Sequence, residues 1–361
     1  MDDVPQRRMD VEAHAKGSTP TARLADQALR YACREIGLME GVLRPWVDPL
    51  AVERLRDMVY SVLTTIAALA SQGKVHPMPR LRLGPEDPPG SRVRRRLRLG
   101  VFPISANPLH WMHLGAGLMA IARLHLDSVV YIIAGDDPRK PGLLRAEVRH
   151  AIAQEMLRPF APFFRYSPIA IGSDLPGEEN LFRLLSMNPD QPIDAHYLAG
   201  SDHYQRLCPT SGEPDTIQRL EDGVRKRIYG YRPGVHSVSA AFLDRGIPTR
   251  PVKTFLDVTW IQDIPMKCSS TGIRKALGGQ GPPAELLGLP YSVFCHIRSL
   301  GLYRPHPLEG VRNPREVGDT RATPFHTMPL RAAASRAAAS AEATSAEARD
   351  QERAFLESLQ S

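Results

Sequence analysis

Two histidines stand three residues apart where an expected strand gives way to an expected helix. His110 and His113 follow the apolar stretch 96–102, and Pro108 stiffens the loop that precedes them. This spacing puts both imidazoles on one face of the first helical turn, beside backbone N–H groups that have no partner within the helix. Imidazoles and a helix N-terminus both stabilise the negative charge of phosphate oxygens. The pattern therefore predicts a phosphate-binding site, against the commoner structural role of an isolated histidine.

A second stretch, residues 269–274, reads Ser-Ser-Thr-Gly-Ile-Arg at another expected helix start. Its hydroxyls and backbone N–H groups can bind phosphate oxygens, and the Arg274 guanidinium can hold a triphosphate through paired hydrogen bonds. The alternative interpretation is a capped helix with a surface arginine. Taken together with the histidine pair, the stretch favours transfer of a nucleotidyl group.

Nucleotidyl transfer needs no nucleophile from the protein when the acceptor brings its own phosphate oxygen. Catalysis then depends on positioning the reactants and on stabilising the charge that develops as pyrophosphate leaves. We expect His110, His113 and Arg274 to supply that stabilisation, with Mg²⁺ bound to the nucleoside triphosphate. Asp136 and Asp137 are candidate ligands of this ion, although a Gly-Asp-Asp-Pro sequence more often forms a turn. The identity of the metal ligands stays open.

The elements around these residues alternate between strand and helix. Apolar or β-branched runs that end in loops predict strands, and helical periodicity between them predicts helices. The expected strands are 96–102, 128–134, 164–171 and 195–199, with 252–256 and 258–261 as one or two further strands. The expected helices are 110–123, 143–157, 178–186 and 292–300. This alternation predicts an α/β fold with a doubly wound, mostly parallel, Rossmann-like sheet, whose ligands bind beyond the carboxyl ends of the strands.

Two helices are expected before the sheet. In the first, apolar residues recur at helical spacing until Gly37, which we expect to end the helix. In the second, Asp48 is a favourable N-cap with Pro49 at the first helical position, and an apolar seam continues to Gly73. We expect the seam to pack on the first helix or on the main core. The alternative is a homo-oligomer formed through the 48–72 helix.

Composition divides the chain into five segments. A polar N-terminus is expected to be disordered, and the helical extension is followed by a linker rich in proline, glycine and arginine. The nucleotidyltransferase domain and a low-complexity tail of Ala, Ser, Glu and Arg come next. The expected bounds are 1–19, 20–76, 77–95, 96–300 and 301–361, in that order.

Charge and cysteine usage limit the possible partners. The net charge of +7 comes partly from an arginine-rich run at 92–98, which lacks the interleaved aromatic residues of a nucleic-acid-binding surface. The four cysteines lack the paired spacing of zinc sites or disulfide frameworks, which fits a reducing cytoplasm. No stretch reaches 18 uninterrupted apolar residues. We therefore expect a cytoplasmic protein that binds neither nucleic acid nor membranes.

The motifs together resemble those of the nicotinamide/nicotinate mononucleotide adenylyltransferase family, over about residues 97–300. Members of that family have a first strand ending in Gly-x-Phe, then a loop with proline and a (His/Thr)-x-x-His helix start, similar to residues 100–113 here. Gly200-Ser201-Asp202 resembles the family's Gly-x-Asp, and residues 269–274 resemble its Ser-Ser-Thr-x-Ile-Arg. Three motifs in the family's order on a matching α/β pattern make the resemblance specific.

The resemblance implies ATP as the donor and nicotinamide or nicotinate mononucleotide as the small phosphorylated acceptor. It also implies nucleotide-binding roles, with Lys140 the loosest match, for Gly100, Val101, Phe102, Pro108, Lys140, Gly200, Asp202, Ser269, Ser270, Thr271 and Ile273. Two alternatives stay open. One is a CTP-dependent cytidylyltransferase acting on a small phosphate or phosphonate, and the other is a nucleotide-binding regulator without turnover.

The chain departs from the family pattern at two places. Residues 103–106 separate Phe102 from the Asn-Pro of the loop, which predicts a changed loop over the triphosphate. The family stacks the pyridine ring of its acceptor on a tryptophan soon after Gly-x-Asp, whereas the next tryptophan here is Trp260. Trp111, Tyr204 and Trp260 are the candidates for such a ring.

Overall fold

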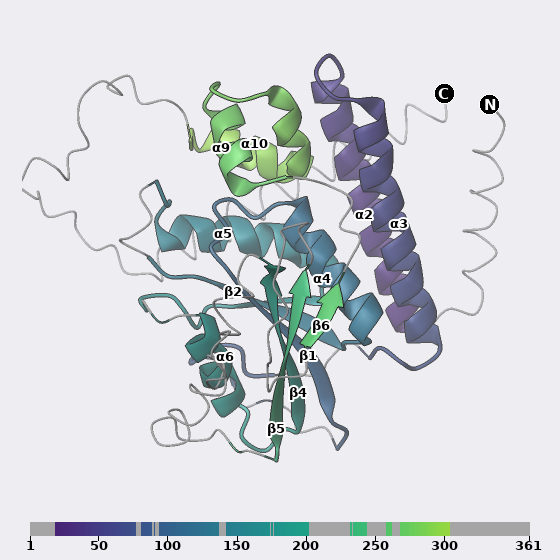
Figure 1. The fold of residues 1–361 in the computed structure, drawn as a ribbon, viewed down its shortest axis with the longest axis vertical. Helices are drawn as coiled ribbons and strands as arrows, with labels where there is room; N and C mark the ends of the chain where they lie inside the picture. The colour runs from purple at the N-terminus through teal and green to yellow at the C-terminus, as the bar shows by residue number, and fades with distance from the viewer. Residues whose placement is uncertain are drawn as a thin grey trace, which may run out of the picture. The chain divides into compact units, whose positions relative to one another are not determined.

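Among the residues that the structure describes, six strands form one sheet in which every neighbouring pair is parallel (Figure 1). Their spatial order is β3 (Phe164–Ser167), β2 (Ser128–Ile133), β1 (Leu97–Ile104), β4 (Ile193–Gly200), β5 (His236–Leu243) and β6 (Val258–Ile261). The order reverses direction between β1 and β4, where doubly wound sheets bind their ligands. The expected α/β, doubly wound, Rossmann-like fold is confirmed.

The structure is a computed structural model that describes residues 19–76, 81–88, 90, 94–136, 142–173, 175, 177–201, 232, 234–243, 258–261 and 268–303. All of them belong to the first of two compact units, Met1–Pro305, and the second unit is His306–Ser361. Nearly all of the expected disordered N-terminus and low-complexity tail therefore lies outside the described residues. The expected strand 252–256 lies outside them too, as do Lys140, Asp202 and Tyr204.

Helices cover both faces of the sheet (Figure 1). On one face lie α4 (Trp111–Leu124) and α5 (Ala146–Leu157), the latter continued by a short 3-10 turn, η2 (Arg158–Phe160). On the other lies α6 (Gly177–Ser186), whose leucines pack on Leu99 and Val101 of β1. Alternate residues of a strand point to opposite faces, so Phe102 and Ile104 join the α4 side. β2 is buried along its whole length, which explains its continuous apolar sequence.

The end of β1 differs from the sequence-based expectation. The strand continues past Phe102 to Ile104, with Pro103 opposite Ile132 and Ile104 opposite Ile133. The pairing of β1 with β4 ends at Val101. Proline has no backbone N–H to donate, but no hydrogen bond to β4 is lost at Pro103 because the two strands are no longer paired there. Two of the four residues expected in a longer loop are therefore strand residues. The third strand is shorter than expected and ends at Ser167.

The N-terminal helices α2 (Pro20–Leu43) and α3 (Pro49–Ser71) pack side by side (Figure 1). The expected end of the first helix at Gly37 is wrong, because the helix continues for six more residues. A Cβ at Gly37 would meet the Arg56 guanidinium of α3 at 3.6 Å, so this glycine faces the partner helix. The expected cap of α3 is confirmed, since the Asp48 carboxylate accepts from the Leu50 N–H over 3.0 Å.

The apolar seam of α3 packs against other helices of the same chain. Most of its residues are buried against α2 and α4 in the same cluster that fills the α4 face of the sheet: Val52, Leu55, Val59, Ile66 and Leu69. Val62, also expected in the seam, is partly buried, and its neighbour Leu63 is fully buried there. We expected the seam to pack in this way. A homo-oligomer formed through the 48–72 helix stays a prediction. In the expected linker, Leu81 is buried against the α6 face of the sheet.

The C-terminal elements are α9 (Ser270–Leu277), η4 (Pro283–Gly288) and α10 (Tyr291–Ser299). Both η4 and α10 contact α2, and α9 contacts η4. Glu35 of α2 is 1% exposed, and its carboxylate accepts from the backbone N–H of Ser292 over 2.7 Å. Tyr31 of α2 also forms a hydrogen bond with the Ser292 hydroxyl at 3.2 Å. A carboxylate at a helix N-terminus satisfies a free N–H and opposes the positive end of the helix dipole. Within the described residues, no helix is both long enough and apolar enough to span a bilayer.

Candidate active site

The two histidines lie together at the start of α4, beyond the carboxyl end of β1. His110 is the N-cap residue, with an extended backbone and a side chain that is 4% exposed. Its carbonyl accepts from the N–H of His113 over 2.9 Å, and the two ring centroids are 3.9 Å apart. The expected placement of both imidazoles on one face of the first helical turn is confirmed.

Aromatic residues of β1 and β2 hold this first turn in place. Tyr131 of β2 is fully buried and donates its hydroxyl proton to the carbonyl oxygen of His113 over 2.8 Å. Burial raises the pKa of this hydroxyl well above its usual value, so it remains a donor. The Phe102 ring lies 5.5 Å from the Tyr131 ring and 6.2 Å from the His113 ring. A Cβ at Gly117 of α4 would lie 2.2 Å from the Tyr131 oxygen, so only glycine leaves room for it.

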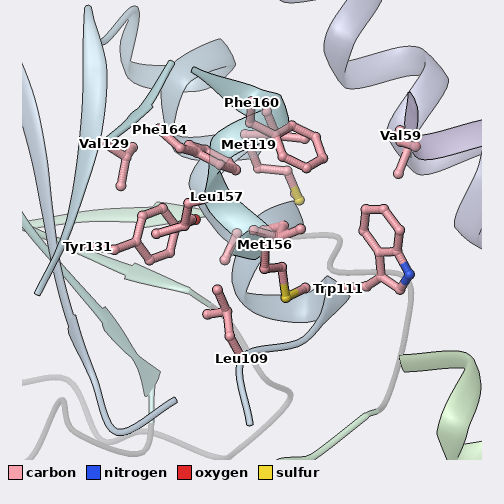
Figure 2. Close-up of a cluster of buried hydrophobic side chains, with 14 of the residues drawn as sticks. Val59, Leu109, Trp111, Met119, Val129, Tyr131, Met156, Leu157, Phe160 and Phe164 are labelled. Carbon is pink, nitrogen blue, oxygen red and sulfur yellow. The ribbon is translucent and has the colours of Figure 1, made fainter. Parts of the chain in front are cut away.

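Trp111, a candidate ring for the acceptor, is a core residue. It is 1% exposed, and its indole meets the Phe160 ring edge-on at 6.3 Å. Figure 2 shows it on the side of the cluster where Val59 of α3 lies. No face of the indole is left for a substrate, so this expectation is wrong for Trp111. The other two candidates, Tyr204 and the Trp260 side chain, lie outside the described residues.

The Ser-Ser-Thr-Gly-Ile-Arg stretch forms the start of α9 and docks on the histidine loop. The Arg274 guanidinium donates through Nη1 to the carbonyl of Asn107 over 2.7 Å and through Nη2 to the Thr271 hydroxyl over 3.2 Å. The Ser270 hydroxyl donates to the carbonyl of Pro108 over 3.0 Å. The structure thus brings the two expected motifs together at one loop.

Two other residues of the stretch shape α9 itself. Ser269 is the N-cap, and its hydroxyl oxygen accepts from the Gly272 N–H over 3.0 Å. Ile273 is fully buried and anchors the helix to the core. The structure therefore shows Ser269 and Ile273 as residues that build the helix start, and their direct contact with a nucleotide stays a prediction.

The expected nucleotide contacts of Gly100 and Val101 need correction. Both lie inside β1, paired with β2 on one side and β4 on the other. A Cβ at Gly100 would approach the side chains of Val129, Leu126 and Leu198 at 2.9–3.1 Å, and Val101 is fully buried. Because the sheet encloses them, they cannot line the loop at the strand end. Gly200 does lie at such an end, as the last residue of β4.

Arg149 of α5 is a site residue that the sequence did not reveal. Its fully buried guanidinium donates to four carbonyl oxygens, of Leu144, Ser105, Ala134 and Gly135, at 2.6–2.8 Å. These carbonyls belong to the loops after β1 and β2, so one side chain fixes both strand ends. Burial lowers the pKa of Arg149, and the nearby Asp136 carboxylate raises it. The available signal was an arginine on the mainly apolar face of α5 that is buried.

The described residues include no cluster of three His, Cys, Asp or Glu side chains that could hold a metal ion. The Asp136 carboxylate accepts from the Ala146 N–H over 2.9 Å at the start of α5 and lies 3.7 Å from the Arg149 guanidinium. This carboxylate therefore binds the start of α5, and its expected role in a turn stays a prediction. Asp137 lies outside the described residues.

Comparison with known proteins places the chain in a family. The chain is 30% identical over 208 residues to the probable nicotinate-nucleotide adenylyltransferase of Roseiflexus sp. (strain RS-1), a match that covers 57% of the chain and 98% of that relative. The chain belongs to this family of nucleotidyltransferases. A second adenylyltransferase of the same name, from Thermoanaerobacter sp. (strain X514), is 24% identical over 226 residues, which cover 61% of the chain and all of that relative. No family model matches the chain.

The comparison with solved structures also found a similar protein. Nicotinic acid mononucleotide adenylyltransferase of Plasmodium falciparum, complexed with NaAD, aligns with 58% of the chain and 98% of its own length. The identity is 14% and the TM-score 0.44.

Proposed function

We propose that the protein transfers the adenylyl group of ATP to the phosphate of nicotinate mononucleotide, with release of pyrophosphate. The observation that carries the proposal is the docking of Arg274 on the loop that leads into the His110–His113 pair. Family membership supports the choice of substrates, because the relatives are named probable nicotinate-nucleotide adenylyltransferases.

In the proposed reaction, an oxygen of the acceptor phosphate attacks the α-phosphorus of ATP. A new P–O bond forms, and the bond from the α-phosphorus to the oxygen shared with the β-phosphate breaks. Pyrophosphate leaves with the bonding electron pair, so negative charge grows on its oxygens. No covalent bond to the protein forms at any stage, and catalysis therefore rests on positioning and on charge stabilisation.

The chain's own residues supply that stabilisation from two sides. His110 and His113 present imidazoles beside the N-terminus of α4, where backbone N–H groups face the loop. Arg274 approaches from α9, and its guanidinium has five N–H donors, of which two hold Asn107 and Thr271. Its remaining donors can bind a phosphate oxygen. His110, His113 and Arg274 are thus the catalytic residues of the proposal.

Mg²⁺ would enter this site with the triphosphate. The described residues provide no three-ligand cluster for it, and an ion held mainly by phosphate oxygens and water needs few protein ligands. When bound, it would neutralise part of the phosphate charge. We assign no protein ligand to it.

The function is tested by measuring pyrophosphate release and dinucleotide formation by the full chain. ATP and CTP are each paired with nicotinate mononucleotide, nicotinamide mononucleotide and a small phosphonate. ATP with nicotinate mononucleotide should be the fastest pair. A preference for CTP with the phosphonate would replace the proposal by the cytidylyltransferase alternative. Nucleotide binding without turnover for any pair would instead favour the alternative of a nucleotide-binding regulator.

The histidine assignment has a matched control on the same helix. His113→Ala should lower kcat by on the order of a hundredfold, as expected when a donor to the transition state is lost. His125, the left-handed C-cap at the far end of α4, should tolerate replacement by Asn, which adopts that conformation readily. If both variants keep the wild-type rate, the site is misplaced.

A further inference from the structure

The segment after α10 returns to the site. Tyr303, four residues past the end of the helix, donates its hydroxyl proton to Oδ1 of Asn107 over 2.8 Å. Its backbone has a φ of +60°, a left-handed conformation that a bulky residue adopts only when its surroundings hold it there. Gly278, at the C-cap of α9, makes room, since a Cβ at that position would lie 3.1 Å from the Tyr303 carbonyl oxygen.

Asn107 connects Tyr303 to the rest of the site. The Asn107 side chain is buried, and its Nδ2 donates to the carbonyl of Gly142 over 3.0 Å. Its own carbonyl accepts the hydrogen bond from Arg274 at 2.7 Å. It lies three residues before His110 in a short loop. A shift of Asn107 would therefore move both the arginine and the start of the histidine helix.

The surroundings of the Tyr303 hydroxyl fix its role as a donor. The guanidinium groups of Arg149 and Arg274 are close enough to act on its charge. Burial nevertheless raises the pKa of Tyr303, because removal from water disfavours the phenolate more than the two cations favour it. The hydroxyl keeps its proton at neutral pH and presents it to the Asn107 oxygen.

We propose that Tyr303 is a positioning residue for nucleotidyl transfer, whose hydroxyl fixes Asn107 and, through it, Arg274 and the loop that carries the histidine pair. The expected effect of the Tyr303 hydroxyl on the reaction rate rests on the proposed function. Its expected effect on the positions of His110 and His113 does not, so the rate and the geometry are tested separately.

The geometric test compares imidazole NMR signals of wild type, Tyr303→Phe and Tyr291→Phe in the full chain without substrate. Tyr303→Phe removes only the hydroxyl, and it should shift the signals of His110 and His113. The signals of His196 and His236, within strands β4 and β5, should not move. Tyr291→Phe, which removes a hydroxyl at the start of α10, should leave all four unchanged. Unchanged His110 and His113 signals in Tyr303→Phe would overturn the proposal.

The kinetic test uses a double-mutant cycle with Asn107→Ala. Tyr303→Phe should lower kcat about tenfold with KM for ATP little changed and the melting temperature within a few degrees of wild type, because only reactant alignment is lost. In the Asn107→Ala background the same change should have no further effect. Independent, multiplying losses or an unaltered kcat would contradict a role through Asn107. If wild type itself shows no turnover, the proposed function fails, and the NMR comparison alone decides the role of Tyr303.

Discussion

Arg274 and Asn107 stand 167 residues apart in the sequence, yet a guanidinium N–H of the first donates to the carbonyl oxygen of the second over 2.7 Å. The bond joins α9 to the loop between β1 and α4, so the two motifs of the site are one assembly. The same guanidinium also holds Thr271, within its own helix. Arg274 therefore organises the site before any substrate binds.

Replacement of Arg274 by lysine tests this double role. An ammonium on a flexible stem cannot donate in the fixed directions of a guanidinium, so contacts to Asn107 and to a phosphate cannot both be kept. We expect kcat to fall about a hundredfold in pyrophosphate-release assays. The neighbouring Lys275 is exposed, and Lys275→Met should keep the wild-type rate. A fully active Arg274→Lys enzyme would show that charge alone suffices.

Arg149→Met should destabilise the fold strongly. The substitution removes a buried cation that donates to three carbonyl oxygens at the ends of β1 and β2 and to a fourth just before α5. We expect the free energy of unfolding in urea to fall by about 3–5 kcal/mol. Arg145, at the N-cap of the same helix, has a side chain that is 82% exposed, so Arg145→Met should change stability by less than about 0.5 kcal/mol. Equal effects of the two substitutions would contradict the role of Arg149 at the strand ends.

Gly117→Ala should clash with the tyrosine that holds the histidine turn. The added methyl would lie 2.2 Å from the Tyr131 hydroxyl oxygen, and overpacking of this kind costs about 1–3 kcal/mol. The loss should be smaller in a Tyr131→Phe background, where the oxygen is gone. Thermal unfolding of the two single variants and the double variant measures this coupling, and strictly additive losses would argue against the clash.

The acid sensitivity of the fold should depend on His150. Its side chain is 3% exposed, it contacts the Tyr166 hydroxyl at 2.5 Å, and burial together with the Arg149 charge lowers its pKa to about 4. The unfolded chain has a histidine pKa of about 6.5, so the unfolded state takes up the proton first as pH falls. Stability that is present above pH 6.5 should therefore be lost between about pH 6.5 and 4, by about 3 kcal/mol.

The measurement for His150 is the pH dependence of urea unfolding in wild type and in His150→Leu. The variant is expected to be less stable at pH 7, because the Tyr166 hydroxyl loses its hydrogen bond with the imidazole, but to lose less stability on acidification. Parallel pH profiles would show that other groups cause the acid sensitivity.

Local sequence signals predicted the elements and their order. The β-branched run of β2, and the Asp48-Pro49 start and regular seam of α3, were sufficient because these signals come from neighbouring residues. Gly37 and Pro103 misled for the same reason. Glycine and proline normally interrupt a helix or a strand, but here distant parts of the fold allow them. Gly37 faces α3, and the hydrogen-bonded pairing of β1 with β4 ends before Pro103.

The candidate site was predictable where it rested on motifs. The proximity of His110 and His113 followed from helix geometry, and their union with Arg274 followed from a family resemblance. Arg149 and Tyr303 belong to no such motif, and their partners are carbonyls and an amide brought close only by the fold. Hydrogen bonds between residues so far apart in the sequence follow no regular spacing, so they could not be predicted from the sequence.

Glu35 connects the N-terminal hairpin, formed by α2 and α3, to the candidate site. Its carboxylate caps α10, and α10 leads to Tyr303. A protease cut within residues 77–95 would sever the covalent link between the hairpin and the sheet while leaving this cap and the shared core in place. The two fragments should therefore remain bound to each other and separate only in denaturant. After such a cut, the two helices would be held to the sheet as a separate subunit is held, by packing and hydrogen bonds alone.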